Sequence, residues 1–230
     1  DVWVPSSTKV KPQIGWQYAL GYFRNFKDNL WETSIEVYYK DMKNQIEYRE
    51  GAQPDDDIKN NQDNNFVYGD GWSYGAEFFV KKAKGRWNGW VGYTLSWTDR
   101  KFPDLNDNKT FPAKYDRRHD VSIVLTFEIN KKWTIGATWI YATGNSLNLP
   151  ESRLFLNGPI DLGQLIANQN VPGQIYNEYG DRNSYRQEPY HRLDISATLQ
   201  GKKHKKWEGS WNFSVFNVYN RYNPYFIYFD

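Results

Sequence analysis

The strongest constraint in this 230-residue sequence is an alternation of apolar and polar side chains along segments of about ten residues. In residues 30–40 the odd positions are Trp, Thr, Ile, Val and Tyr, whereas the even positions from residue 32 onward are Glu, Ser, Glu, Tyr and Lys. Successive side chains of a β-strand point to opposite faces, so this segment predicts a strand with one apolar face. No segment keeps apolar residues at helical spacing for long.

The same alternation recurs along the chain and predicts about eight strands. It is clear in residues 30–40, 86–99, 121–129 and 193–199, and weaker in residues 16–26, 72–80, 133–143 and 207–219. Several of these segments approach the roughly 9 to 11 residues of a tilted transmembrane strand. We therefore expect an all-β, antiparallel, up-and-down architecture.

Composition excludes several other classes. The sequence has no cysteine, which removes disulfide scaffolds, thiolate metal sites and cysteine nucleophiles. Its longest apolar run, residues 225–229, is far too short for a membrane-spanning helix. The 29 basic and 27 acidic residues nearly balance, so charge gives no indication of a nucleic-acid partner.

No catalytic, metal or cofactor site emerges from the motifs. The three histidines, His119, His191 and His204, lack the spacing of a zinc motif and are expected at the surface or at strand ends. Residues 115–120, YDRRHD, predict ion pairs at a strand entrance, because no nucleophile or matching base accompanies them. We expect no cofactor and no enzymatic activity.

The two ends of the predicted sheet differ. Short Lys-rich turns near Lys27, Lys84, Lys131 and Lys205 are each followed by tryptophan, whereas the other connections, residues 49–70, 100–118 and 144–189, are long. Tryptophans at the start of several strands, all at the short-turn end, predict an aromatic girdle at the periplasmic membrane interface. These girdle residues are Trp31, Trp87, Trp133 and Trp207.

Alternation alone leaves two other classes open. A soluble carbohydrate-binding β-sandwich also alternates and needs no membrane. A small autonomous outer-membrane barrel or adhesin would share the strands and the girdle, but it would place both termini at the periplasmic end. The unequal ends of the sheet and the register of the tryptophans favour a transmembrane barrel.

Four segments together resemble the late barrel strands of TonB-dependent outer-membrane receptors of the Bacteroidetes type. They are residues 3–23, 115–150, 185–199 and 213–224, the last reading FSVFNVYNRYNP. The resemblance implies a 22-stranded barrel around a plug domain in the outer membrane of a Gram-negative bacterium. Such a receptor imports a scarce nutrient, for example a siderophore, glycan, cobalamin or peptide, with energy delivered by TonB.

Residues 1–230 would then form one partial transmembrane β-barrel domain of eight consecutive strands. We expect the plug, the segment that contacts TonB, the earlier strands and the final strand to lie outside it. If the short turns face the periplasm, both ends of the sequence lie outside the cell. Open sheet edges in lipid would leave backbone groups unsatisfied, which also predicts further strands.

The two faces of the sheet have different expected partners. The apolar face, with Ile35, Val37, Val91, Leu95, Ile123, Leu125, Ile195 and Phe213, is expected to contact outer-membrane lipid. The polar face is expected to line the lumen and contact the protein's own plug; its candidates are Glu32, Glu36, Lys40, Glu77, Glu128, Arg192, Asp194 and Asn212.

Ligand capture is expected in the long outer connections. The candidates are Tyr176, Tyr179 and Tyr185, in a segment whose composition suits sugar, peptide or chelate contacts equally. Beyond lipid and plug, the expected partners are the TonB complex, through a part outside this sequence, and an unidentified small-molecule, glycan or peptide ligand. A surface lipoprotein is a further candidate partner, and no nucleic acid is expected.

Overall fold

The computed structural model describes residues 6–7, 9–49, 62–156, 174–201 and 207–225, except the side chains of residues 62, 153–156 and 174–177. Within these ranges the only helical segments are two short 3-10 turns, η1 (Gln62–Asn65) and η2 (Asn106–Asn108). No helix of the described chain is long and apolar enough to span a membrane. The rest is β-strand and connection, as the alternation predicts.

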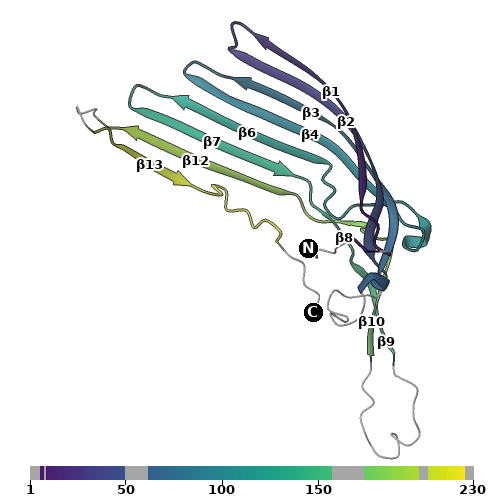
Figure 1. Cartoon of the computed structure of the whole chain (residues 1–230). Helices are drawn as coiled ribbons and strands as arrows, with labels where there is room; N and C mark the ends of the chain where they lie inside the picture. The colour runs from purple at the N-terminus through teal and green to yellow at the C-terminus, as the bar shows by residue number, and fades with distance from the viewer. Residues whose placement is uncertain (1–5, 8, 50–61, 157–173, 202–206, 226–230) are drawn as a thin grey trace, which may run out of the picture.

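Eight strands follow one another in a single antiparallel sheet (Figure 1). They are β1 (Ile14–Phe26), β2 (Trp31–Tyr48), β3 (Phe66–Lys82), β4 (Trp87–Lys101), β6 (His119–Glu128), β7 (Trp133–Ala142), β12 (Tyr190–Gln200) and β13 (Ser210–Val215). The short β5 (Phe111–Pro112) adds to β4. Each long strand pairs with its neighbour in sequence order, so the predicted up-and-down architecture is confirmed.

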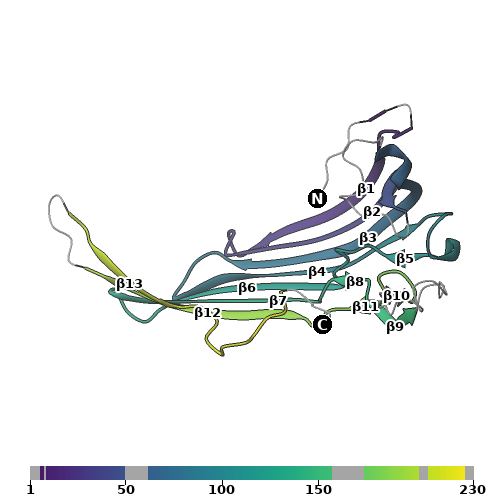
Figure 2. The same cartoon turned by 90° about the horizontal axis from the view of Figure 1, so that it is seen from below.

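The sheet is a single curved layer with two open edges. Figure 2 shows it bent into an arc, with β1 at one edge and β13 at the other. These two strands are not paired with each other in the described chain. Among the described residues the other two sheets have only two strands each, so no second layer of a sandwich is present there and the β-sandwich alternative is wrong.

The unequal ends of the sheet are confirmed for the described turns. Short turns join β1 to β2, β3 to β4 and β6 to β7. In the first, Lys27, Asp28 and Asn29 all adopt left-handed backbone conformations, as a tight reversal requires. The fourth predicted turn, around Lys205, lies outside the described residues.

The first two predicted connections are shorter than expected, because strands occupy residues 66–70 of the first and residues 100–101 of the second. β2 extends to Tyr48 and β3 starts at Phe66, so residues 66–70 belong to a strand. The third connection carries two small antiparallel pairs: β8 (Ser146–Leu147) with β11 (Tyr185–Arg186), and β9 (Pro150–Leu156) with β10 (Gln174–Tyr179). Figure 1 shows β9 and β10 extending away from the main sheet.

The register keeps the two faces separate across the sheet. Ile35 lies opposite Phe78, Phe78 opposite Tyr93, and Tyr93 opposite Val121. A slip of one residue in any strand would move its apolar side chains to the other face. All eight residues predicted for the apolar face share one face, and all eight predicted for the polar face share the other.

Burial is confined to the end of the sheet with the long connections. There Val67, Phe102, Leu105 and Phe111 form the hydrophobic cluster of the described chain, and Phe102 is 0% exposed. In the six strands from β2 to β12 of the main sheet, every exposed large apolar side chain lies on the apolar face. They are Ile35, Val37, Tyr39, Tyr74, Phe78, Val80, Trp87, Val91, Leu125, Phe127, Ile135 and Ile195.

Candidate functional site

An inner aromatic belt lies at the short-turn end of the apolar face. Trp31, Trp87 and Trp133 are the first residues of β2, β4 and β7. The rings of Trp31 and Trp87 meet edge to face with centroids 5.7 Å apart. Trp207, 79% exposed, lies just before β13 at the same end of the sheet. The structure therefore places all four predicted tryptophans at one end.

An outer aromatic belt, which the alternation alone did not predict, lies on the same face toward the long connections. Tyr74 stacks on Trp97 at 5.2 Å, and Tyr39 lies directly opposite Tyr74. The belt continues through Trp139, Tyr141, His191 and Tyr219, with ring centroids 5.4 to 6.4 Å apart. The spacing could have revealed it, since Tyr39 follows Trp31 by eight residues and Trp97 follows Trp87 by ten.

The two belts are separated by a distance that suits a bilayer. Eight to ten residues at about 3.3 Å each, in strands tilted by about 40°, rise about 20 to 25 Å, close to the roughly 25 Å apolar band of outer-membrane barrels. From β2 to β13, this face carries no Asp, Glu, Lys or Arg between the belts in the described chain.

Two histidines belong to this face and hydrogen-bond tyrosines. His119 Nδ1 lies 2.9 Å from Tyr93 Oη, and His191 Nδ1 lies 2.8 Å from Tyr219 Oη. His119 is the first residue of β6 and His191 the second of β12, so their predicted position at strand ends is confirmed. His204 lies outside the described residues. Among the described residues, no group of three or more His, Asp or Glu could hold a metal ion.

Several predicted polar-face residues have partners within the chain. Lys81 Nζ lies 3.1 Å from Glu32, and Arg192 lies 2.8 Å from Asp194. Asp194 also accepts a 2.9 Å hydrogen bond from the backbone N–H of Asn217. Asn212 Nδ2 donates to Thr198 Oγ1 at 2.9 Å. These contacts use part of the bonding capacity that was expected to serve a plug.

Three other carboxylates form an acidic row across the polar face. Glu36 lies directly opposite Glu77, and the row continues through Thr94 to Asp120. Among the described residues, Glu36 and Glu77 have no ion pair, whereas Asp120 lies 4.0 Å from Arg117. The row borders a pocket on this face that also includes the aromatic pair Phe79 and Trp90, 5.9 Å apart.

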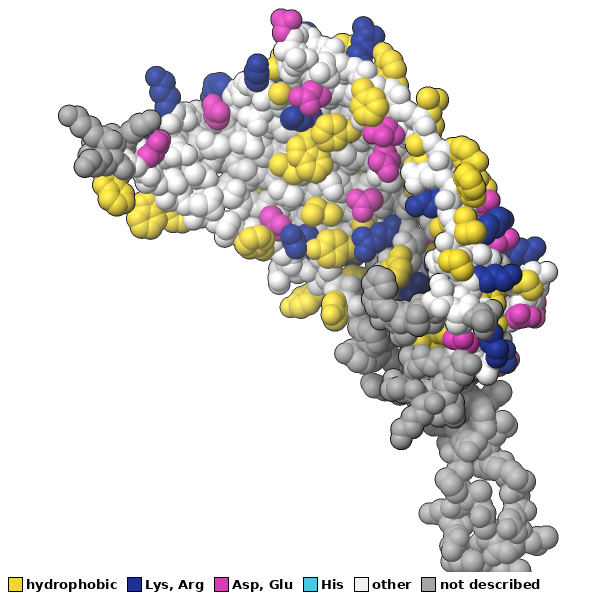
Figure 3. Space-filling view, viewed as in Figure 1, with side chains coloured by type: hydrophobic (Ala, Val, Ile, Leu, Met, Phe, Trp, Pro, Cys, Tyr) yellow, Lys and Arg dark blue, Asp and Glu magenta, His cyan; other side chains and the backbone are white. Residues whose placement is uncertain are grey.

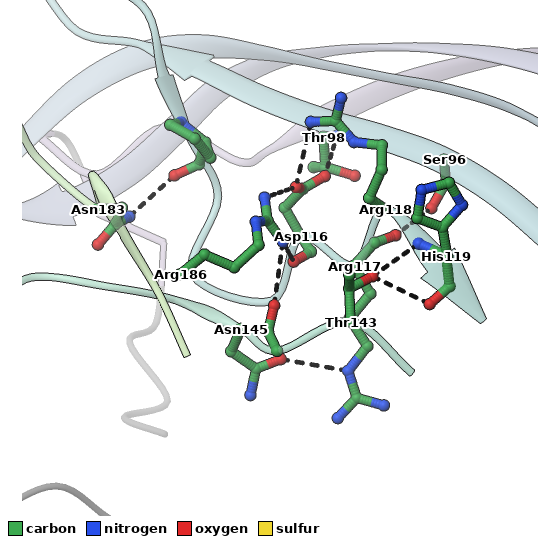
Figure 4. Close-up of polar contacts among 12 residues, drawn as sticks. Ser96, Thr98, Asp116, Arg117, Arg118, His119, Thr143, Asn145, Asn183 and Arg186 are labelled. Carbon is green, nitrogen blue, oxygen red and sulfur yellow. Dashed lines mark hydrogen bonds and ion pairs between the residues drawn. The ribbon is translucent and has the colours of Figure 1, made fainter. Parts of the chain in front are cut away.

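A buried carboxylate organises the long connections at the outer end of the sheet (Figure 4). The side chain of Asp116 is 1% exposed; its Oδ1 accepts from the Thr98 backbone N–H at 2.8 Å and its Oδ2 from Arg186. Arg118 lies 3.6 Å from the same oxygen. Arg186 also donates to the backbone carbonyls of Asp116 and Gly144, at 2.9 and 3.0 Å. The predicted ion pairs of residues 115–120 are confirmed.

Further contacts join the connection of residues 102–118 to that of residues 143–189. Asn183 Nδ2 donates to the Pro112 carbonyl at 2.9 Å, and the Arg182 backbone N–H donates to Asn106 Oδ1 at 2.7 Å. Lys109 lies 3.3 Å from Asp181. Because these contacts join segments about 70 residues apart, the bases of the two connections form one structural unit.

The three predicted ligand-contacting tyrosines lie on the longest connection, and no contact joins Tyr179 to Tyr185 among the described residues. Tyr179 is the last residue of β10 and is 51% exposed, whereas Tyr185, in β11, is 43% exposed. The side chain of Tyr176 is outside the described part of the chain. Of the remaining polar-face candidates, Lys40 borders a separate pocket and Glu128 is exposed at the short-turn end.

Comparison with known proteins agrees with this geometry. Residues 2–220 match the family model of the TonB dependent receptor-like β-barrel, so the chain belongs to that family. No curated protein matches the chain.

Solved structures with the same fold are receptors and transporters. P. aeruginosa FpvA bound to heterologous pyoverdines has a TM-score of 0.58 at 16% identity, over 92% of this chain and 24% of that one. The ferric-catecholate import receptor Fiu of E. coli has a TM-score of 0.56 at 14% identity, over 94% and 24%. The FrpB iron transporter of Neisseria meningitidis has 0.55 at 15% identity, over 93% and 28%. The chain thus spans about a quarter of the length of these proteins.

Proposed function

We propose that this chain is part of the wall of an outer-membrane receptor for TonB-dependent uptake of a scarce nutrient. One observation carries the proposal. From β2 to β13, an apolar face without charged side chains lies between two aromatic belts in the described chain, and the other face carries carboxylates and ammonium groups; on β1 the same apolar face carries one arginine, Arg24. This is the arrangement of a barrel wall with lipid on one side and a polar interior on the other.

The wall belongs to a closed barrel of about 22 strands, of which the chain supplies eight. β1 and β13 each leave one row of backbone N–H and C=O groups without a strand partner in the described chain. In hydrocarbon each unsatisfied group costs several kcal/mol. Further strands that pair with both edges remove this penalty.

The polar face contacts a plug domain inside the barrel, chiefly through the acidic row. Glu36, Glu77 and Asp120 lie in one row beside Phe79 and Trp90, and the two glutamates have no cationic partner in the described chain. Three carboxylates beside aromatic rings suit arginine or lysine side chains. Figure 3 shows acidic and basic side chains among uncharged ones on the face that it presents. Arg192, Asp194 and Asn212, which already have partners, contribute less.

Nutrient capture takes place at the long connections, which stand at the outer end of the barrel. Tyr179 and Tyr185 are exposed there and offer rings and hydroxyls to a ligand. The ligand is a siderophore, glycan, cobalamin or peptide, and the fold neighbours with iron-related names favour a siderophore.

The receptor is of the Bacteroidetes type, by the resemblance of residues 115–150, 185–199 and 213–224. A surface lipoprotein would cover the same outer end.

Uptake assays on the source bacterium test this function. Deletion of the gene should abolish growth on one nutrient class supplied at limiting concentration, and depletion of TonB should have the same effect. Supply of that nutrient at high concentration should restore growth in both strains. Recovery of the protein in the soluble fraction, or growth on every nutrient class without the gene, would contradict the proposal.

A further inference from the structure

A pocket on the outward side of the wall lies just beyond the outer aromatic belt. It is lined by Tyr39 and Trp72, by the charged residues Asp41, Lys43, Asp70 and Lys101, and by Tyr68 and Asn108. Asp41 pairs with Trp72, and Asp70 with Lys101, on the face that carries the apolar band. The pocket is therefore on the lipid side of the wall and not on the polar face.

The two carboxylates and two ammonium groups of the pocket balance in charge, but only one of the ammonium groups is paired among the described residues. Lys43 Nζ lies 3.3 Å from Asp41 and 3.1 Å from Asp70, so this ammonium group is held between two carboxylates. Lys101 lies opposite Asp70 in the register but has no ion pair among the described residues. Its ammonium group remains available for an anionic ligand.

A second polar group in the pocket also lacks a partner. Tyr68 Oη is buried and has no hydrogen-bond partner in the part of the chain that the structure describes. An unsatisfied hydroxyl costs about 1 to 3 kcal/mol, so a ligand that accepts its hydrogen bond gains part of that energy. Beside it, Tyr39 and Trp72 provide flat aromatic surfaces.

We infer that this pocket binds the phosphorylated sugar headgroup of an outer-leaflet glycolipid. The inference rests on the proposed membrane location, because only then does the headgroup layer meet the wall just outside the aromatic belt. Lys101 donates to a phosphate oxygen, and Asp41 and Asp70 accept from sugar hydroxyls. Tyr39 and Trp72 contact the sugar rings and the start of the acyl chains.

Binding of lipid A to the purified full-length receptor tests the inference. The probe is bis-phosphorylated lipid A, titrated in a nonionic detergent and followed by native mass spectrometry. Lys101→Glu should weaken binding tenfold or more, because it replaces an attractive charge by a repulsive one. Lys84→Glu makes the same change of net charge at the short-turn end and should leave binding unchanged.

A conservative variant provides a second readout. Tyr68→Phe keeps the ring and removes only the hydroxyl, so the fold is retained and binding should weaken about two- to tenfold. Dephosphorylated lipid A should bind at least tenfold more weakly than the bis-phosphorylated form to the wild-type receptor. Inorganic phosphate at the same concentrations should not compete, since it lacks the sugar and the acyl chains.

Two results would overturn the inference. One is equal affinity of the wild type and Lys101→Glu for lipid A. The other is full competition by inorganic phosphate, which would indicate a site for free phosphate. Nutrient uptake by Lys101→Glu should equal that of the wild type. If the receptor is in the outer membrane and lipid A binding is insensitive to these changes, only this inference fails. If the receptor is not in the outer membrane, the proposed function fails as well.

Discussion

The part of the sheet between the aromatic belts and the part beyond the outer belt use the same strands but are stabilised differently. Between the belts, large apolar side chains such as Ile35 and Leu125 are exposed, and no layer of protein covers them in the described chain. Beyond the outer belt, Phe102, Leu105 and Phe111 are almost fully buried. In the proposed membrane location the first part takes its apolar contacts from lipid, whereas the second part has a core of its own.

This difference shows how one strand can pass from one solvent to another. β4 begins at Trp87 with an exposed apolar face, which we propose meets lipid, and it ends at Lys101 beside the buried cluster. The burial of apolar surface stabilises both parts. The two parts should therefore respond differently to mutation and to the surrounding lipid.

The largest effect is expected in the loop-end core. Phe102→Ala removes a ring that is 0% exposed and should destabilise the outer part by about 3 to 5 kcal/mol, because a cavity remains. The measurement is hydrogen exchange of the β4 and β5 amides at this end, in detergent and in vesicles. The same loss in both media is expected, since the core does not use lipid. A loss that disappears in one medium would contradict a self-contained core.

Ile123→Arg should be the most damaging change on the apolar face. Ile123 lies near the middle of β6, and an arginine near the bilayer midplane destabilises a barrel by about 2 to 4 kcal/mol. The free energy of unfolding in lipid vesicles measures the effect. Ser122→Arg, its neighbour on the polar face, is the matched control and should change this free energy by less than about 1 kcal/mol. Equal losses for both variants would contradict the assignment of the faces.

Asp116→Asn should loosen the base of the longest connection. It leaves Arg186 and Arg118 without their shared carboxylate and should weaken the cluster by about 1 to 3 kcal/mol. Faster hydrogen exchange is expected at β8 and β11, with the middle of β3 unchanged. Asp107→Asn, at an exposed carboxylate of the neighbouring connection, should have no effect on this exchange.

Trp31→Ala should have the smallest effect. It removes an interfacial ring and the edge-to-face contact of this ring with Trp87. The contact itself stabilises the wall by about 0.5 to 1.5 kcal/mol, in addition to the contribution of the ring's apolar burial. Unfolding in vesicles measures it, and Trp31→Phe should recover most of the loss. No difference between Trp31→Ala and wild type would indicate that the inner belt does not stabilise the wall.

The alternation of apolar and polar residues was sufficient to predict the eight strands and their two faces. It failed beyond the outer belt: the alternation of β2 was followed only to residue 40 and the segment predicted for β3 began only at residue 72, whereas β2 reaches Tyr48 and β3 begins at Phe66. A bulge shifts the register between Met42 and Gln45, and Gly69 and Gly71 supply no side chains, so the period of two is lost there.

Two features of the candidate site were not predicted, for different reasons. The outer belt was missed because Tyr39 and Trp97 were counted only as members of an apolar face, although their spacing from Trp31 and Trp87 was available. The partner of Asp116 could not be foreseen, since Arg186 is 70 residues away and folds back through a long connection.

Collision accessibility of spin labels along β6 tests directly whether the apolar face of the wall meets lipid. The 230 residues contain no cysteine, so single cysteines can be placed at each position from 120 to 127 in the full-length protein, reconstituted in vesicles. If the wall faces lipid, labels at positions 121, 123 and 125 should be highly accessible to oxygen, which concentrates in lipid. The same labels should be poorly accessible to a water-soluble nickel chelate. High accessibility of these positions to the nickel chelate, or no two-residue period, would contradict a lipid-facing wall.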